Sequence, residues 1–293
     1  MNYKPFLTID EQIELLRSRG LTIDDENAAK RFLSEHNYYR VSGYSLTLRH
    51  NNQFFESASF QNIIDIYNFD HELRHILLTF IEIIEVRIKS VYAYEFAQLY
   101  GPLGYLNDCH FTNTKEYGII IKKVEELKKS RVNHEAFLKH YINELKQDLP
   151  LWAYVELLTI SDISILYSIS DNICRRNIAA AFNLTNNKGA DILAHYLHSM
   201  TIIRNLCAHG SRLFNRLFEQ KPSLNRKEQA LLIKDKDGII DNSHLYGFIL
   251  VMKRLLSENQ FSDMKEKIID LTIKLPFVRM DYYGFRNDWQ DVL

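Results

Sequence analysis

An arginine and a histidine in the C-terminal half are the residues whose types and spacing best fit a chemical role. Four residues separate Arg204 from His209, and Asn205 directly follows the arginine. A guanidinium can hold a phosphate through two parallel hydrogen bonds, and an imidazole can transfer a proton near neutral pH. These two groups suffice to cleave RNA without a metal ion, because RNA carries its own nucleophile in the 2′-hydroxyl group. The pair therefore indicates binding or cleavage of RNA.

The spacing alone is weak evidence, because Arg31 and His36 are separated by the same number of residues. Two neighbouring residues distinguish Arg204 and His209 from Arg31 and His36. Asn205 can orient a phosphate or the imidazole, and Ala208 leaves room beside the histidine. The predicted catalytic residues are therefore Arg204, Asn205 and His209.

Basic residues concentrate around this pair. The whole chain has a formal net charge of −1, so a surface that binds nucleic acid must be local. Residues 204–227 contain six basic residues and one acidic residue, a formal charge of +5. Such a concentration is typical of phosphate binding. In addition to Arg204 and His209, this concentration of charge predicts five RNA-binding residues, which are Arg212, Arg216, Lys221, Arg226 and Lys227.

Helix geometry limits how the two side chains can meet. Five positions along a helix rotate a side chain by about 140°, so Arg204 and His209 do not share a helical face. Gly210 is placed to end the helix, and His209 would then lie at the terminus, where the imidazole can turn back toward the arginine. The negative end of the helix dipole favours a protonated imidazole there. Alternatively, His209 caps the helix and Arg204 pairs with a carboxylate.

Apolar spacing predicts an all-α fold to position these residues. Residues 59–100 contain no glycine or proline and predict one long helix, or two helices joined by a kink. Asp70 and Arg74 are spaced to pair on its surface. We expect a turn at 37–44, and a loop or small hairpin within 219–241. The other predicted helices are 8–19, 25–35, 114–129, 133–146, 151–168, 172–182, 189–209, 243–257 and 262–274.

Composition narrows the class of protein. The N-terminus is not of the secretory type, and Glu82 and Glu85 interrupt the most apolar run, which excludes it as a membrane span. Three scattered cysteines form neither a disulfide framework nor a zinc ligand set. The histidine pairs 71/75 and 195/198 lack an acidic pattern that would complete a metal site. We therefore expect a cytoplasmic protein without a membrane segment, a metal or a cofactor.

Five segments together resemble the motifs of Abi-type abortive-infection proteins of the AbiD/AbiF group, which belong to the HEPN superfamily of helical ribonucleases. The segments occur in family order and cover nearly the whole chain. They are Tyr38-Tyr39-Arg40-Val41-Ser42-Gly43-Tyr44, residues 67–74 with 84–87, Pro150-Leu151-Trp152 with Glu156, residues 204–216, and Gly284-Phe285 with Trp289. Gly210 stands where relatives often have a second histidine, so His209 is the only candidate imidazole in the motif.

The resemblance implies a HEPN-like helical bundle with long central helices, comprising residues 51–293, and an N-terminal helix–turn–helix-like extension, residues 1–50. It also implies a metal-independent endoribonuclease toxin of phage defence, in which His209 transfers protons, Arg204 stabilises phosphate charge and Asn205 orients the pair. The implied partners are substrate RNA, a small structured antitoxin RNA and a second subunit that completes a composite site. Arg40 and Tyr44 are predicted to contact RNA, unless their segment only packs on the central helix.

Two other functions remain open at this stage. The chain could be a non-catalytic RNA-binding protein of a toxin–antitoxin or defence system, held by a small structured RNA. It could also be a DNA-binding regulator that uses the N-terminal helix pair. The basic residues lie around Arg204 and His209 and not within residues 8–35, which favours RNA over DNA.

Overall fold

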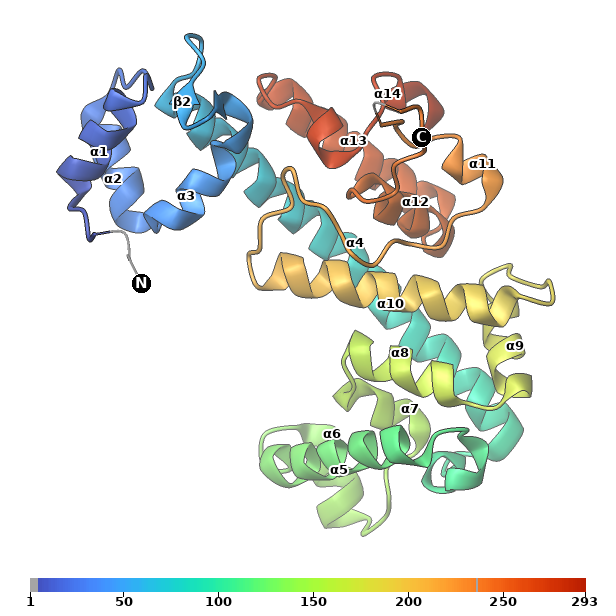
Figure 1. Cartoon of the computed structure of the whole chain (residues 1–293). Helices are drawn as coiled ribbons and strands as arrows, with labels where there is room; N and C mark the ends of the chain where they lie inside the picture. The colour runs from blue at the N-terminus through green and yellow to red at the C-terminus, as the bar shows by residue number, and fades with distance from the viewer. Residues whose placement is uncertain (1–4, 236) are drawn as a thin grey trace.

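One helix, α4 (Phe60–Tyr100), runs through the molecule, and the other elements are arranged along it (Figure 1). The computed structural model describes residues 5–235 and 237–293. At 41 residues, α4 is about 61 Å long. The Ser59 side chain caps its start and accepts a hydrogen bond from the Asn62 amide, and Gly101 ends it with a positive φ of 78°. The prediction of a long helix is confirmed, without an interruption.

The N-terminal elements lie at the start of α4 (Figure 1). They are α1 (Ile9–Ser18), α2 (Glu26–Glu35), α3 (Tyr38–Tyr44), the 3₁₀ turn η1 (Leu46–Leu48), and the short strands β1 (Arg49–His50) and β2 (Gln53–Phe54). The strands form an antiparallel hairpin that the sequence analysis did not predict. Asn51 and Asn52 connect them with positive φ angles of 47° and 65°, the conformation of a tight hairpin turn.

The expected turn at residues 37–44 is instead the helix α3. Asn37 caps it by accepting a hydrogen bond from the Tyr39 amide. Val41 and Tyr44 point into the core and are almost completely buried. Packing against α4 therefore selects a helix in a segment whose glycine and tyrosines are weak helix formers.

The middle of the chain surrounds the far end of α4 (Figure 1). The predicted helix 151–168 is divided, because Thr159 caps a new helix together with Asp162. The predicted helix 133–146 contains only one α-helical turn, followed by a π-helical segment. The elements are η2 (Gly104–Leu106), η3 (Asp108–His110), α5 (Thr114–Arg131), α6 (Ala136–Leu138), η4 (Lys139–Glu144), α7 (Leu151–Tyr154), η5 (Val155–Leu157), α8 (Ile160–Ile169) and α9 (Asn172–Ala180).

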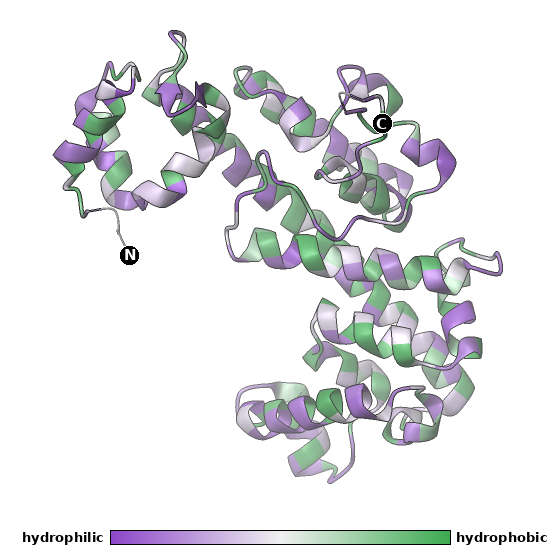
Figure 2. Ribbon diagram, viewed as in Figure 1, coloured by the Kyte–Doolittle hydropathy of each residue, from purple (hydrophilic) through white to green (hydrophobic). Residues whose placement is uncertain are grey.

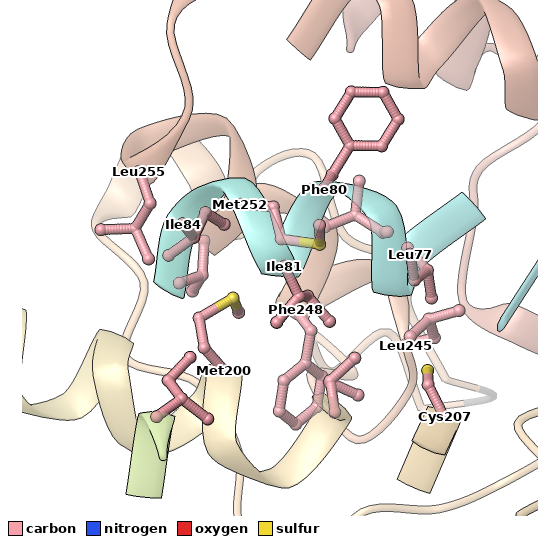
Figure 3. Close-up of a cluster of buried hydrophobic side chains, with 14 of the residues drawn as sticks. Leu77, Phe80, Ile81, Ile84, Met200, Cys207, Leu245, Phe248, Met252 and Leu255 are labelled. Atoms are coloured by element: carbon pink, nitrogen blue, oxygen red, sulfur yellow. The ribbon is translucent and has the colours of Figure 1, made fainter. Parts of the chain in front are cut away.

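The C-terminal elements cross α4 and form the central core. Figure 3 shows Met200 of α10 (Gly189–Ala208) near Ile81 of α4 and Phe248 of α12 (Tyr246–Leu255), and Cys207 of α10 on the side of Leu77 and Leu245. The remaining elements are α11 (Arg226–Gln229), α13 (Glu258–Lys274), η6 (Met280–Tyr283) and α14 (Trp289–Val292). Within 219–241, only the isolated bridge between Lys234 and Ile240 resembles the expected hairpin, and Lys236 lies outside the described residues.

The described structure confirms the all-α fold class, since its only sheet is the two-stranded hairpin. Hydrophobic residues dominate where α10 and α12 cross α4, whereas α11 is largely hydrophilic (Figure 2). No helix in the described part of the chain combines the length and apolar character that crossing a bilayer requires.

Removing one central ring should destabilise the whole fold. Phe248 is completely buried between α10 and α4, so we expect Phe248→Ala to lower the free energy of unfolding by about 3–5 kcal/mol. Urea unfolding followed by circular dichroism measures this change. The control is Ile273→Ala on α13, where the side chain is 71% exposed and the expected change is within about 0.5 kcal/mol. Equal effects of the two substitutions would contradict the assignment of this core.

Candidate functional site

Arg204, Asn205 and His209 lie at the C-terminal end of α10 and are accessible. Asn205 and His209 are exposed, and Arg204 is partly exposed. The Arg204 Nη1 atom donates a hydrogen bond of 3.3 Å to Asn205 Oδ1. Asn205 thus contacts the arginine, a contact that the sequence did not predict, and both polar side chains are open to a ligand.

The structure does not bring the imidazole of His209 back to Arg204. His209 keeps a nearly helical backbone with φ −89° and ψ 10°, and its amide donates to the Asn205 carbonyl at 3.0 Å. The side chains of Arg204 and His209 therefore remain about 140° apart around the helix axis. Among the described residues, no hydrogen bond or ion pair joins the two side chains, and none joins Arg204 to a carboxylate. The expectation of a turned-back imidazole is wrong for a single chain.

Gly210 ends α10 as the sequence predicts. Its φ is +62°, a conformation that side-chain-bearing residues rarely adopt. The Gly210 amide donates to the Cys207 carbonyl at 3.0 Å, and the Ser211 amide donates to the Leu206 carbonyl at 2.8 Å. This is the Schellman pattern, which satisfies the last carbonyls of the helix. The end of α10 and the residues after it consequently have a defined direction.

Residues 210–214, here called the motif loop, are bound to α4 by Asp70. The Phe214 amide donates to Asp70 Oδ1 at 2.8 Å, and the Leu213 amide donates to both carboxylate oxygens at 3.1 and 3.2 Å. Asp70 is fully buried. Burying a carboxylate without hydrogen-bond donors would cost folding free energy, so the backbone amides of the motif loop stabilise Asp70 in the core.

Three side chains complete the surroundings of Asp70, and we call the four residues the Asp70 cluster. The Tyr44 and Tyr283 hydroxyls donate to the carboxylate at 2.8 and 3.0 Å, and the guanidinium of Arg74 pairs with it. Arg74 is only 3% exposed, so the predicted surface pair Asp70–Arg74 is a core pair. Arg74 also donates to the Ser211 carbonyl at 3.5 Å.

The Asp70 cluster is built for an ionised carboxylate. Burial raises the pKa of the Asp70 carboxyl, whereas the charge of Arg74 and the hydrogen bonds that the carboxylate accepts lower it. Arg74 and the backbone amides of Leu213 and Phe214 can only donate, so they favour the ionised form. Burial, reinforced by the nearby Asp70 charge, also raises the pKa of the Tyr44 and Tyr283 hydroxyls, which therefore remain protonated donors.

Tyr44 is consequently not available to RNA. Its side chain is completely buried, and its hydroxyl is committed to Asp70. The ring packs edge-on against Tyr67 of α4 at a centroid distance of 5.1 Å. This burial contradicts the prediction that Tyr44 contacts RNA, and it supports the alternative that this segment packs on the central helix.

Arg40 and Arg212 connect α3 to the motif loop in opposite directions. The Arg40 guanidinium donates to the Gly210 carbonyl and lies over the Tyr67 ring, 5.5 Å from its centroid. Arg212 Nη1 in turn donates to the Gly43 carbonyl of α3 at 2.7 Å. Both side chains remain partly exposed. They fix the loop and leave part of their charge near His209.

The other predicted basic residues do not form one compact patch. Arg216 donates to the Arg212 carbonyl at 3.4 Å and lies over the Phe218 ring. The chain then runs back along α10, where Gln220 contacts His198. His198 precedes His209 by eleven positions, or about 16 Å of helix. Lys221, Arg226 and Lys227 follow and are exposed, so the charge is spread along α10 and not gathered at His209.

Cys207, inside the sequence motif, belongs to the core. Burial raises the pKa of its thiol to about 12, so the thiol stays protonated and is a poor nucleophile. Within residues 5–235 and 237–293, no three His, Cys, Asp or Glu side chains are grouped in a way that could hold a metal ion. The accessible groups that remain at the helix end are the guanidinium of Arg204, the amide of Asn205 and the imidazole of His209.

Asp70 and Tyr283 are parts of the site that the sequence did not predict. A signal for Asp70 existed, since an Asp–Arg pair with a four-residue spacing interrupts a strongly apolar helix. No local pattern connects Tyr283 to Asp70, because 213 positions separate them along the chain.

The Asp70 cluster yields a stability prediction. Asp70→Asn keeps the size of the side chain but leaves Arg74 as a buried charge without a partner. We expect it to lower the free energy of unfolding by about 3–5 kcal/mol, measured by urea denaturation. Asp263→Asn is the matched control, because Asp263 also pairs with a cation four residues away but is 55% exposed, and its expected cost is below about 1 kcal/mol. A similarly small cost at Asp70 would show that the cluster does not stabilise the fold.

Comparison with known proteins identifies the family. The model of the Abi-like protein family matches residues 31–215, more than half of the chain, including α3, Asp70 and the motif loop. Neither the curated proteins nor the solved structures yield a significant match. The family match confirms the resemblance to abortive-infection proteins that the sequence motifs indicated. The chain belongs to the Abi-like protein family.

Proposed function

We propose that this protein is a metal-independent endoribonuclease of the HEPN superfamily that acts in abortive-infection defence against phage. The observation that supports this most directly is the accessible set of Arg204, Asn205 and His209 at a helix end whose direction is fixed by Gly210 and the Asp70 cluster. Membership of the Abi-like family supports the defence role. We expect the enzyme to act on RNA in the cytoplasm.

The proposed reaction uses the ribose as the nucleophile. The 2′-oxygen forms a bond to the adjacent phosphorus, and the bond from phosphorus to the 5′-oxygen breaks. The 2′-hydroxyl loses its proton, and the leaving 5′-oxygen gains one from His209 acting as a general acid. Arg204 stabilises negative charge on the phosphate oxygens, and Asn205 orients the guanidinium. The products are a 2′,3′-cyclic phosphate and a 5′-hydroxyl.

We further propose that two subunits supply one composite site. Arg204 and His209 are about 140° apart around the helix axis, and no hydrogen bond joins them within one chain. A second copy related by a twofold axis would bring another Arg–His pair to the same phosphate. It would also provide a second imidazole, so that one histidine accepts a proton while the other donates one.

The catalytic roles can be tested with purified protein and RNA in excess chelator. We expect wild-type protein to cleave, and His209→Ala to reduce the rate by about 100-fold or more while RNA binding is retained. Arg204→Ala should cause a loss of about the same size. His195→Ala is the matched control, because this exposed histidine lies on the same helix roughly 21 Å from His209 and should leave the rate unchanged.

Each other outcome of this assay has a defined meaning. Cleavage that persists in both His209→Ala and Arg204→Ala would refute the catalytic assignment. A requirement for added Mg²⁺ would refute the metal-independent mechanism. Binding without cleavage by the wild-type protein would favour the second candidate function, a non-catalytic protein held by a small structured RNA. The observation that favours this non-catalytic function is that no hydrogen bond joins Arg204 and His209 within one chain.

A subunit-mixing experiment tests the composite site. Wild-type protein is mixed with increasing amounts of the Arg204→Ala/His209→Ala double variant, and the subunits are allowed to exchange. If both subunits contribute to one site, activity per wild-type subunit should fall in proportion to the wild-type fraction. An activity per wild-type subunit that stays constant would show that each chain cleaves alone.

A further inference from the structure

The N-terminal helix α3 is fixed directly beside the proposed catalytic residues. Arg40 of α3 bonds to the Gly210 carbonyl, one residue after His209, and Arg212 bonds to the Gly43 carbonyl. A Cβ atom built on Gly43 would lie 3.5 Å from Arg212 Nε, an ordinary van der Waals distance, so the Arg212 side chain packs directly against this position. The face of α3 that carries Gly43 therefore lies against the guanidinium of Arg212.

Tyr39 belongs to the same face of α3. It precedes Gly43 by four positions, so the two residues are neighbours on the helix surface. Its side chain is 87% exposed, whereas Tyr44 in the same helix is completely buried. The backbone of Tyr39 is nevertheless well anchored, because its amide is bound by Asn37 and its carbonyl accepts a hydrogen bond from Ser42. An exposed aromatic ring thus lies on a helix with anchored backbone, next in sequence to Arg40 and one turn from Gly43, whose carbonyl binds Arg212.

We propose that Tyr39 is a stacking platform for an unpaired RNA base near the scissile phosphate. An exposed ring offers a flat apolar face to any base, and the adjacent partly exposed arginines offer charge to the RNA backbone. Bases of a duplex are already stacked and paired, so such a platform selects single-stranded segments, loops or bulges. This proposal rests on the proposed function, because it takes RNA as the ligand, and it narrows the substrate to unpaired RNA.

The test measures RNA binding separately from cleavage. In the His209→Ala background, a short fluorescein-labelled oligoribonucleotide of mixed sequence is titrated with protein, either single-stranded or annealed to its complement. We expect Tyr39→Ala to weaken single-strand binding by about 5- to 150-fold, the range for loss of one stacked base. Tyr39→Phe keeps the ring and should bind within about twofold of the parent. Tyr94→Ala is the control, because Tyr94 is 68% exposed but lies roughly 30 Å along α4 from Arg74.

The remaining outcomes are decisive for this proposal. Unchanged single-strand affinity in Tyr39→Ala would overturn it, as would an equal loss in Tyr39→Phe, which would assign the effect to the hydroxyl. An equal dependence of duplex binding on Tyr39 would overturn the preference for unpaired bases. A change in oligomeric state with unaltered RNA affinity would show that Tyr39 contacts a second copy instead. If Tyr39 governs binding but wild-type protein never cleaves, the stacking role stands and the proposed catalytic function fails.

Discussion

A single buried carboxylate, that of Asp70, determines how the C-terminal end of α10 is presented to solvent. Asp70 accepts hydrogen bonds from two backbone amides of the motif loop, from two tyrosine hydroxyls and from Arg74. These donors come from α3, α4, the motif loop and η6, so the full set of hydrogen bonds to Asp70 forms only when four separate parts of the chain meet. A surface loop would ordinarily be mobile, but here the loop's own amides compensate a charge in the core.

The same arrangement explains why some residues of the motif pack in the core while others remain accessible to a ligand. Cys207 and Leu213 face the core, while Asn205 and His209 face solvent. Arg40 and Arg212 use part of their hydrogen-bonding capacity to join α3 to the loop. Arginine suits this double task, because a guanidinium has five donors and can bond to a carbonyl while it still offers donors to a phosphate.

Local sequence signals predicted the fold well and the site only in part. The long apolar repeat of α4 and the glycine that ends α10 follow from short-range rules, and the structure confirms both. The helix α3 did not follow from such rules, since it depends on burying Val41 and Tyr44 against α4. The placement of Tyr44 and the dispersal of Lys221 along α10 also depend on tertiary contacts. Charge counted along the sequence cannot reveal that the chain reverses beside His198.

The hydrogen bond from Tyr283 to Asp70 has a consequence for the order of events during synthesis. It joins residues 213 positions apart, and Tyr283 lies close to the C-terminus. A chain folds from its N-terminus as it emerges from the ribosome, so α4 and α10 are available well before this last donor. The support beneath the motif loop is therefore completed only after Tyr283 has emerged from the ribosome. For a protein proposed to cut RNA, a nascent chain that has not yet exposed Tyr283 would lack the finished framework of its site.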